Sequence, residues 1–228
     1  VEKKITKKTK AIVPVHFTGL MCKMDEIKKI ATKYNLKIIE DAAQAFGAKY
    51  KGRKVGTFSD VASFSFNVMK NVGGFGEAGA VTTNSKKIYE MIKMLRYTGT
   101  KSDPKKIITN ECYHVALNHK IDTIQAAMLL VLLKHFKKRM SRRLEIAKLY
   151  NKELNNYVTC PVIQSRESTH GLYTYAIQTN KRDKLMRYLN DKGIQNKIYH
   201  IPLASDAPVF KKYRRFKTPN ARKILSRF

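Results

Sequence analysis

The sequence predicts an α/β fold in which helices flank a mostly parallel sheet. Residues 11–15 form a short apolar run, residues 24–34 carry apolar side chains at helical spacing, and residues 36–39 form a second apolar run. Strand, helix and strand in this succession make a βαβ unit, whose two strands are parallel. In such sheets the chemistry lies beyond the carboxyl ends of the strands. Asp41 lies at one of these ends and is the first candidate functional residue.

The following segments continue the alternation of strands and helices. Two apolar runs predict a third and a fourth strand, at residues 62–66 and 79–83. Asn84 or Ser85 then caps a helix, because a short polar side chain can accept a hydrogen bond from the first free N–H groups. That helix is expected to run to about Tyr97, and Gly99 is placed to stop it.

The remainder of the chain predicts three further helices and a smaller domain. Residues 122–139 are apolar enough for a long helix, and residues 141–157 are amphipathic. After Pro161 we expect a helix at residues 182–192, ended by Gly193. Strands are expected on either side of it, at residues 172–178 and 195–199. We therefore predict two partial domains, residues 1–140 and a smaller α+β domain at 141–228.

Composition excludes several classes of protein. Hydrophobic residues make up 43% of the 228 residues, whereas disordered chains are poor in them. The longest apolar run, residues 126–133, is too short to span a bilayer. The three cysteines lie far apart without metal-ligand spacing, which predicts reduced thiols in a cytoplasmic protein and no metal site. They are Cys22, Cys112 and Cys160.

The strong positive charge suggests nucleic-acid binding, but its distribution argues against it. The chain has 46 Lys and Arg against 17 Asp and Glu, a net charge of +29. Basic residues are spread along the whole chain, and Lys outnumbers Arg by 34 to 12. Lys is the poorer of the two at bidentate contacts with bases and phosphates. A basic binding module that keeps the fold but has no catalytic activity is therefore only an alternative.

A glycine-rich loop around Lys70 is the main candidate for chemistry. Lys70 follows the strand predicted at residues 62–66 and precedes a turn whose glycines let the backbone approach a ligand closely. These glycines are Gly73, Gly74, Gly76 and Gly79. Neither Lys70 nor Asp41 alone can be distinguished from an ordinary polar residue. Together they match a pyridoxal phosphate site, which needs a lysine for the aldehyde and a carboxylate for the pyridinium nitrogen.

Several short sequence segments match the motifs of one family, in the same order along the chain. They are residues 11–19, the E-D-A-A-Q segment 40–44, the F-S-F-x-x-x-K-N segment 64–71, Asn118 with the D-T-I-Q-A-A segment 122–127, and the late segments 193–194 and 201–203. On these residues the chain resembles the sugar-nucleotide aminotransferases of the DegT/StrS type. The resemblance implies the fold of pyridoxal phosphate-dependent transferases of fold type I, with an incomplete large domain.

The resemblance implies a role for each matching residue. Lys70 would bind the aldehyde of pyridoxal phosphate and afterwards move a proton as base and acid. Asp41 would pair with the pyridine nitrogen of the cofactor. Gln44 would hydrogen-bond its 3-hydroxyl, and the small Ala43 would let its ring lie close to the backbone. Ser65 would contact its phosphate.

Other residues receive shared or substrate-related roles from the resemblance. Asn118 would reach the phosphate bound by a neighbouring subunit, which implies a homodimer with shared active sites. Tyr199 lies in a stretch that is near the sugar nucleotide in the family. Lys120 stands where the family usually has Arg, and Lys cannot reproduce a bidentate fork. His16 is either a wall of the cofactor pocket or a core histidine with satisfied hydrogen bonds.

The implied reaction is a ping-pong transamination in surface polysaccharide or glycan precursor synthesis. Glutamate would give its amine, and a keto-deoxy sugar linked to a nucleoside diphosphate would receive it. Family members with His in place of the lysine catalyse dehydration, so Lys70 favours transamination and the dehydratase branch stays an alternative. The family has a further segment before residues 11–15, which supplies a phosphate-binding helix N-terminus. We therefore expect a chain truncated at both ends and inactive by itself.

Overall fold

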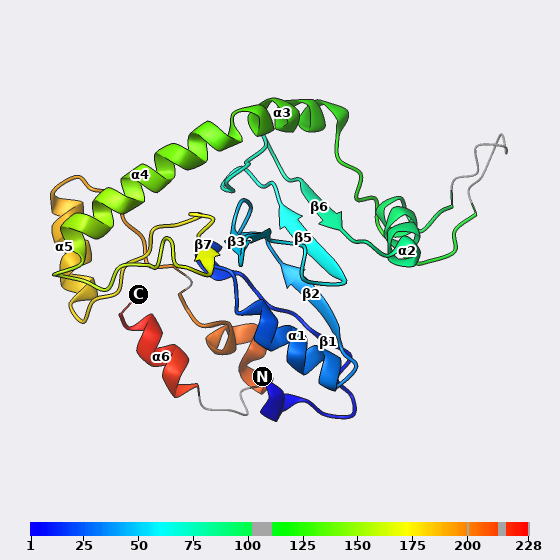
Figure 1. The fold of residues 1–228 in the computed structure, drawn as a ribbon, viewed down its shortest axis with the longest axis horizontal. Helices are drawn as coiled ribbons and strands as arrows, with labels where there is room; N and C mark the ends of the chain where they lie inside the picture. Colours follow the sequence, from blue (N-terminus) through cyan, green and yellow to red (C-terminus); the bar gives the residue numbers. More distant parts are fainter. Residues whose placement is uncertain (102–110, 200, 214–217, 228) are drawn as a thin grey trace. The chain divides into compact units, whose positions relative to one another are not determined.

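The structure, a computed structural model, describes residues 1–101, 111–199, 201–213 and 218–227. The chain divides into two compact units, and Figure 1 shows their elements. The first unit comprises Val1–Ile146 and Val162–Thr174. The second comprises Ala147–Pro161 and Tyr175–Phe228. Helix α4 therefore begins in the first unit and ends in the second.

A four-stranded sheet in the order β1-β2-β5-β6 forms the centre of the first unit (Figure 1). β1 (Ala11–Ile12), β2 (Lys37–Asp41) and β5 (Val61–Ser65) are parallel, and β6 (Gly79–Thr82) runs antiparallel to β5. The predicted α/β class with a mostly parallel sheet is confirmed. Because β2 and β5 are parallel neighbours, their carboxyl ends lie at the same edge of the sheet.

The first strand is shorter than predicted. Beyond Ile12 only Val15 pairs, in an isolated bridge with Asp41. Pro14 interrupts the ladder because proline has no N–H to donate, although its carbonyl accepts from the backbone of Asp41 at 2.9 Å. The segment after β1 is thus still tied to the end of β2.

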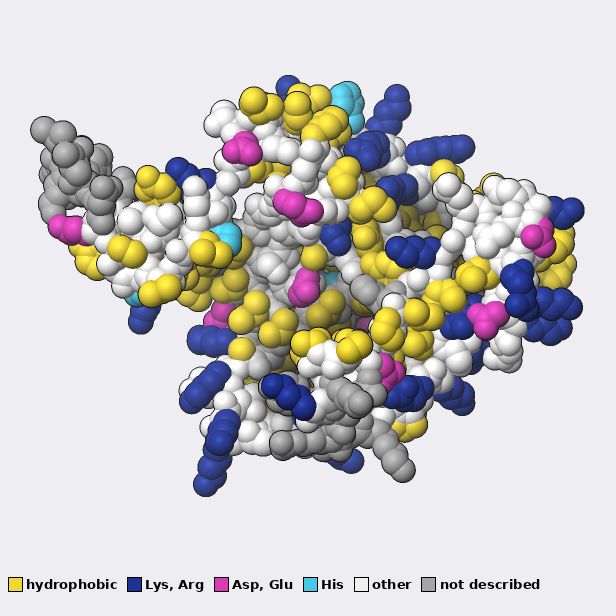
Figure 2. All heavy atoms as spheres, turned by 180° about the vertical axis from the view of Figure 1, so that it is seen from behind, with side chains coloured by type: hydrophobic (Ala, Val, Ile, Leu, Met, Phe, Trp, Pro, Cys, Tyr) yellow, Lys and Arg dark blue, Asp and Glu magenta, His cyan; other side chains and the backbone are white. Residues whose placement is uncertain are grey.

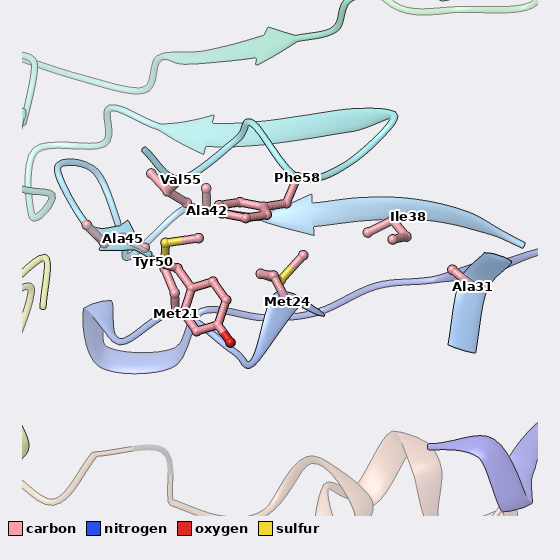
Figure 3. Close-up of a cluster of buried hydrophobic side chains, with 10 residues drawn as sticks. Met21, Met24, Ala31, Ile38, Ala42, Ala45, Tyr50, Val55 and Phe58 are labelled. Atoms are coloured by element: carbon pink, nitrogen blue, oxygen red, sulfur yellow. The ribbon is translucent and has the colours of Figure 1, made fainter. Parts of the chain in front are cut away.

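Helix α1 (Met24–Lys33) packs against β1 and β2, and a buried cluster fills the space between helix and sheet (Figure 3). Met24 is fully buried at the start of the helix, and Ile38 is buried on β2. Three alanines after β2 are also buried, so this segment packs closely against the core. The cluster consists of Met21, Met24, Ala31, Ile38, Ala42, Ala45, Ala48, Tyr50, Val55 and Phe58.

A small antiparallel sheet, which the sequence analysis missed, follows β2. It contains β3 (Lys49–Tyr50), β4 (Arg53–Lys54) and β7 (Ser168–Thr169), in the order β4-β3-β7. Lys51 and Gly52 turn the chain between β3 and β4 with positive φ values of 47° and 76°. The pairing of β3 with β7 brings residues 162–174 into the first unit.

Helix α2 (Lys86–Arg96) has the ends that the sequence predicts. The Ser85 hydroxyl accepts a hydrogen bond from the Ile88 N–H at 3.4 Å. Gly99 has a φ of +75°, and its N–H donates to the Met94 carbonyl at 3.0 Å. The Ser85 contact is the expected cap at the N-terminus of the helix, and the Gly99 contact is the expected cap at its C-terminus.

The next two helices are α3 (Thr123–Lys134) and α4 (Phe136–Leu154). The prediction of one helix over residues 122–139 is wrong, because the chain breaks at His135. The His135 N–H donates to the Leu132 carbonyl at 3.2 Å, which tightens the last turn of α3. Phe136 then packs edge-on against Phe46 at 5.0 Å between ring centroids. This tertiary contact anchors the first residue of α4.

The second unit contains the end of α4, α5 (Arg182–Asp191) and α6 (Pro219–Leu225). Gly193 follows α5 with a φ of +71°, as expected for a glycine that ends a helix. The strands predicted at residues 172–178 and 195–199 are wrong; there, Gln178 alone pairs, in an isolated bridge with Thr159. Short 3₁₀ helices occupy Glu2–Lys4, Phe17–Gly19, Ala204–Asp206 and Pro208–Tyr213.

None of the helices that the structure describes is long and apolar enough to cross a bilayer. Over the same residues, no group of three or more His, Cys, Asp or Glu side chains is arranged to hold a metal ion.

Candidate active site

The turn after β2 brings three of the predicted cofactor residues together. Asp41 is the last residue of the strand, and its Oδ1 accepts a hydrogen bond from the Ala43 N–H at 3.1 Å. The Gln44 Oε1 accepts from the Thr18 N–H at 2.7 Å. No described residue bonds to the Asp41 Oδ2 or to the Gln44 amide nitrogen. One carboxylate oxygen and one amide donor are thus available to a ligand.

The loop that carries Lys70 begins at the carboxyl end of β5. Ser65 ends that strand, and its Oγ accepts from the Asn67 N–H at 3.3 Å, which leaves the hydroxyl proton for another acceptor. The Lys70 N–H donates to the Asn67 carbonyl at 2.8 Å and closes a tight turn. The Phe66 N–H donates to the carbonyl of Ala78, the residue directly before β6, at 2.8 Å. The loop is therefore held at both ends.

Lys70 itself is half-buried and lies against an aromatic ring. Its Nζ is 4.6 Å from the centroid of Tyr173, and within the described ranges no carboxylate forms an ion pair with it. Asn71 is buried, with 5% of its surface exposed, and its amide nitrogen donates to the carbonyls of Phe46 and Gly171. The Asn71 Oδ1 accepts from Arg143 at 2.8 Å. Lys70 is thus next to a residue that joins three segments of the first unit.

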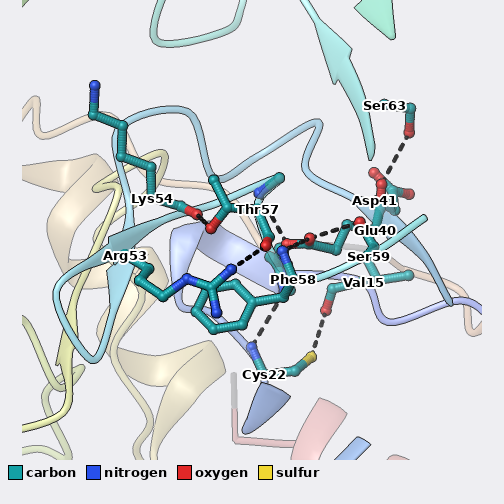
Figure 4. A network of polar contacts seen from close by, with 12 residues as sticks. Val15, Cys22, Glu40, Asp41, Arg53, Lys54, Thr57, Phe58, Ser59 and Ser63 are labelled. Atoms are coloured by element: carbon teal, nitrogen blue, oxygen red, sulfur yellow. Dashed lines mark hydrogen bonds and ion pairs between the residues drawn. The ribbon is translucent and has the colours of Figure 1, made fainter. Parts of the chain in front are cut away.

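Glu40, directly before Asp41, is fully buried and fully hydrogen-bonded (Figure 4). Its carboxylate accepts from His16 Nε2 at 2.9 Å, Gly56 N–H at 3.0 Å, Phe58 N–H at 3.1 Å and Ser59 Oγ at 2.7 Å. Burial alone would raise the pKa of Glu40, but these hydrogen bonds hold it below its usual value. Glu40 therefore stays ionised and fixes the end of β2.

His16 is a satisfied core histidine and not a pocket wall. It is fully buried, and its Nε2 faces Glu40 while its Nδ1 accepts from the Cys22 N–H at 3.2 Å. The backbone N–H of His16 donates to the Asp41 carbonyl at 3.1 Å. His16 thus holds the backbone of Asp41 in place by this hydrogen bond and the side chain of Glu40 by the other.

The remaining predicted residues lie elsewhere. Asn118 is exposed and pairs with Tyr97, beyond the end of α2, and Lys120 places its ammonium 4.1 Å from the Tyr97 ring. The structure does not bring either of them to Lys70. Tyr199 is half-buried and belongs to the second unit.

The basic side chains do not gather in one place on the face that Figure 2 shows. Figure 2 shows Lys and Arg side chains scattered over the visible face, with hydrophobic side chains between them. The exposed apolar residues include a group on α3: Ile124, Met128, Leu130, Val131 and Leu133. Phe75, 72% exposed, lies in the glycine-rich loop, and its N–H donates to Gln125 on α3 at 3.0 Å.

Two contacts around Lys70 could not be predicted from the sequence. Asn71 belongs to the quoted motif, but its buried hydrogen bonds come from partners far away in the sequence. Tyr173 lies in a segment predicted as a strand and carries no local signal for a role beside Lys70. Only the fold reveals these contacts.

The sequence matches a family model described as the DegT/DnrJ/EryC1/StrS aminotransferase family over residues 1–228. It is 38% identical over 244 residues to an uncharacterized protein of Methanocaldococcus jannaschii, covering 100% of this chain and 62% of the relative. It is 36% identical over 204 residues to a dTDP-3-amino-3,6-dideoxy-alpha-D-galactopyranose transaminase of Aneurinibacillus thermoaerophilus, covering 89% of this chain and 54% of that protein.

The fold is also similar to solved structures. The crystal structure of DesV from S. venezuelae matches with a TM-score of 0.90 and 31% identity, covering 99% of this chain and 60% of that one. The chain thus spans less than two thirds of the length of each of these three relatives.

Proposed function

The chain belongs to the DegT/DnrJ/EryC1/StrS aminotransferase family, and from this we propose that it provides the Lys70–Asp41 half of a pyridoxal phosphate site for transamination of a nucleotide-linked keto sugar. One observation carries the proposal. The ends of β2 and β5 present Asp41, Gln44 and Ser65 at one edge of the sheet, each with an atom available to a ligand.

These residues fit the chemistry of the cofactor. When bound, pyridoxal phosphate supplies an aldehyde that carries amino groups and a ring that withdraws electrons from the substrate carbon. The available Asp41 oxygen would accept a hydrogen bond from the protonated pyridine nitrogen, and its negative charge would keep the proton on that nitrogen. The free Gln44 amide would donate to the 3-hydroxyl beside the small Ala43, and the Ser65 hydroxyl would donate to the phosphate.

Lys70 is proposed as the residue that binds the aldehyde and later moves the proton at the substrate carbon. Since no described carboxylate pairs with its ammonium, Lys70 can exchange protons without first breaking an ion pair. A lysine at this position supports transamination over the dehydratase alternative. For the donor we propose glutamate, and for the acceptor a keto-deoxy sugar on a nucleoside diphosphate. The setting we propose is cytoplasmic synthesis of amino sugars for a surface polysaccharide or other glycan.

A homodimer with shared sites is part of the proposal. Asn118 is exposed, away from Lys70, as needed for a residue that would serve the phosphate site of a neighbouring subunit. The exposed apolar side chains of α3 would gain stability by burial against a second copy. Lys120 and Tyr199 are kept as substrate-binding candidates. The division into a cofactor-binding part, residues 1–140, and a smaller domain, residues 141–228, also stays a prediction.

Cofactor capture tests the proposal. Pyridoxal phosphate added to the protein should give an absorbance band near the visible edge, and borohydride should then fix the label on Lys70. Lys70→Ala should abolish the fixed label, whereas Lys192→Ala, which removes an exposed lysine beside Tyr188, should not. Labelling without preference for Lys70 would overturn the proposal.

A further inference from the structure

The buried amide of Asn71 connects the Lys70 loop to the segment that carries Tyr173. Its nitrogen donates to Gly171, and its oxygen accepts from Arg143 at 2.8 Å. The same Nη1 atom of Arg143 also donates to the Leu172 carbonyl at 2.8 Å. Asn71, the neighbour of Lys70, and the two residues before Tyr173 are therefore fixed to each other by one connected set of buried and partly buried hydrogen bonds.

The backbone before Tyr173 is held in an unfavourable conformation. Leu172 is buried, with 6% of its surface exposed, and has a φ of +50°, which a residue with a branched side chain rarely adopts. Its N–H donates to His170 Nδ1 at 2.8 Å, which helps to hold the turn. A Cβ on Gly171 would lie 3.2 Å from the Ala45 backbone, so the turn also packs closely. A residue in this region is energetically costly and keeps its conformation only where the surrounding contacts hold it, as the contacts of His170 and Gly171 do here.

The result of this turn is the contact between Tyr173 and Lys70. The Lys70 Nζ lies 4.6 Å from the ring centroid, within the range of a cation–π interaction. The exposed pairs Lys33–Tyr34 and Lys192–Tyr188 join near neighbours on the chain, with longer separations of 5.2 and 5.8 Å. Lys70 and Tyr173 are far apart in the sequence, so their contact is a product of the fold.

We propose that Tyr173 is a further residue of the Lys70 site, a positioning residue whose ring receives the Lys70 ammonium whenever the lysine is not bonded to a cofactor. Asn71 and Arg143 hold the ring and the lysine in place. The catalytic meaning of this contact rests on the proposed function, because transamination requires a lysine that leaves the cofactor and returns to it. Contact with the Tyr173 ring would keep the released Lys70 side chain close to the cofactor site until it bonds to the cofactor again.

Lysine labelling without any cofactor tests the contact. An amine-reactive ester attacks the neutral amine, and the ring face stabilises the ammonium instead. Tyr173→Leu should therefore increase the labelling rate of Lys70 about two- to fivefold, measured peptide by peptide. Tyr173→Phe keeps the ring and should leave the rate unchanged. Lys120, which lies over Tyr97, serves as an internal reference that neither variant should alter.

A second pair of variants tests the clamp without removing the buried Asn71. Arg143→Leu removes the donor to Asn71 and Leu172, and should reproduce part of the Tyr173→Leu increase. Arg143→Gln keeps an amide donor and should restore slow labelling. If Arg143→Leu has no effect, the clamp is wrong even though the ring contact stands.

Equal labelling of Lys70 in the parent protein and in Tyr173→Leu would overturn the inference. The outcome is separable from that of the proposed function. A protein in which Tyr173 protects Lys70, but borohydride fixes no pyridoxal phosphate there, would keep the contact and lose the transaminase proposal. The reverse pair of results would keep the transaminase and remove Tyr173 from its site.

Discussion

Asp41 offers a test of the cofactor site at the scale of a single residue. Asp41→Asn keeps an oxygen for the Ala43 N–H but loses the negative charge that would hold the pyridinium proton. A hydrogen bond to a charged group contributes about 1.5–3 kcal/mol, so we expect pyridoxal phosphate to bind about ten- to a hundredfold more weakly. Absorbance titration measures this. Asp25→Asn, at an exposed ion pair with Lys51, should bind like the parent, and unchanged affinity in Asp41→Asn would contradict the role.

Glu40 is expected to matter for stability. Glu40→Gln has nearly the same shape but cannot accept all four hydrogen bonds from its partners. Leaving buried donors unpaired should lower the free energy of unfolding by about 2–4 kcal/mol. Urea denaturation followed by circular dichroism would measure the loss. Glu26→Gln, in an exposed pair with Lys23, should cause no comparable change, and equal effects of the two variants would count against the network.

The buried His170 should make the free energy of unfolding depend on pH. Burial lowers the pKa of His170 to about 4, and its Nδ1 accepts the Leu172 N–H, which only the neutral ring can do. Between pH 6.5 and about 4 the unfolded chain binds this proton and the folded chain does not, so stability falls as the pH falls. The loss from this group is up to roughly 3 kcal/mol.

The matching experiment compares the parent with His170→Asn in urea at several pH values. Asparagine can accept the same N–H without titrating. The difference in unfolding free energy between the two proteins should change through this pH window and be constant above it. A constant difference throughout would show that His170 binds its proton as readily in the folded chain as in the unfolded chain, and would contradict the prediction.

At the scale of elements, a substitution on helix α3 can test the proposed homodimer. This helix exposes apolar side chains on much of its surface, with Leu130 62% exposed. Leu130→Glu should therefore shift the protein from dimer to monomer in sedimentation experiments without changing its circular dichroism. Leu149→Glu alters a similarly exposed leucine on α4, 55% exposed, and should leave the dimer intact. Dimer formation unaffected by Leu130→Glu would remove α3 from the interface.

The elements also show what the sequence can predict. Helices α1 and α2 match their predictions because apolar spacing, Ser85 and Gly99 are local signals. Strands β2 and β5 match because each is a short apolar run next to polar residues. The two-residue strands β3 and β7 have no such run; β3 is defined by its pairing with β4 and β7, and β7 by its pairing with β3.

The wrong predictions have tertiary causes. The apolar sequence continues through the helix break, but Phe136 packs on Phe46 and fixes the start of a new helix. The strand predicted at residues 172–178 is interrupted at its first residue, since Leu172 adopts a positive φ to present Tyr173. In the same way, the resemblance places Lys70 and Asp41, whereas the role of Asn71 depends on partners that only the folded chain brings near.

At the scale of the whole molecule, the net charge of +29 provides the test that separates an aminotransferase from a basic binding module. A protein that recognises nucleic acid gathers its basic residues on one face, whereas Lys and Arg are scattered over the face shown in Figure 2. We therefore expect binding to duplex DNA that weakens steeply with salt and equals the binding to heparin at matched charge. Fluorescence anisotropy over a salt series measures both. A preference for one duplex sequence, maintained at high salt, would favour the binding module, because diffuse charge cannot distinguish base sequences.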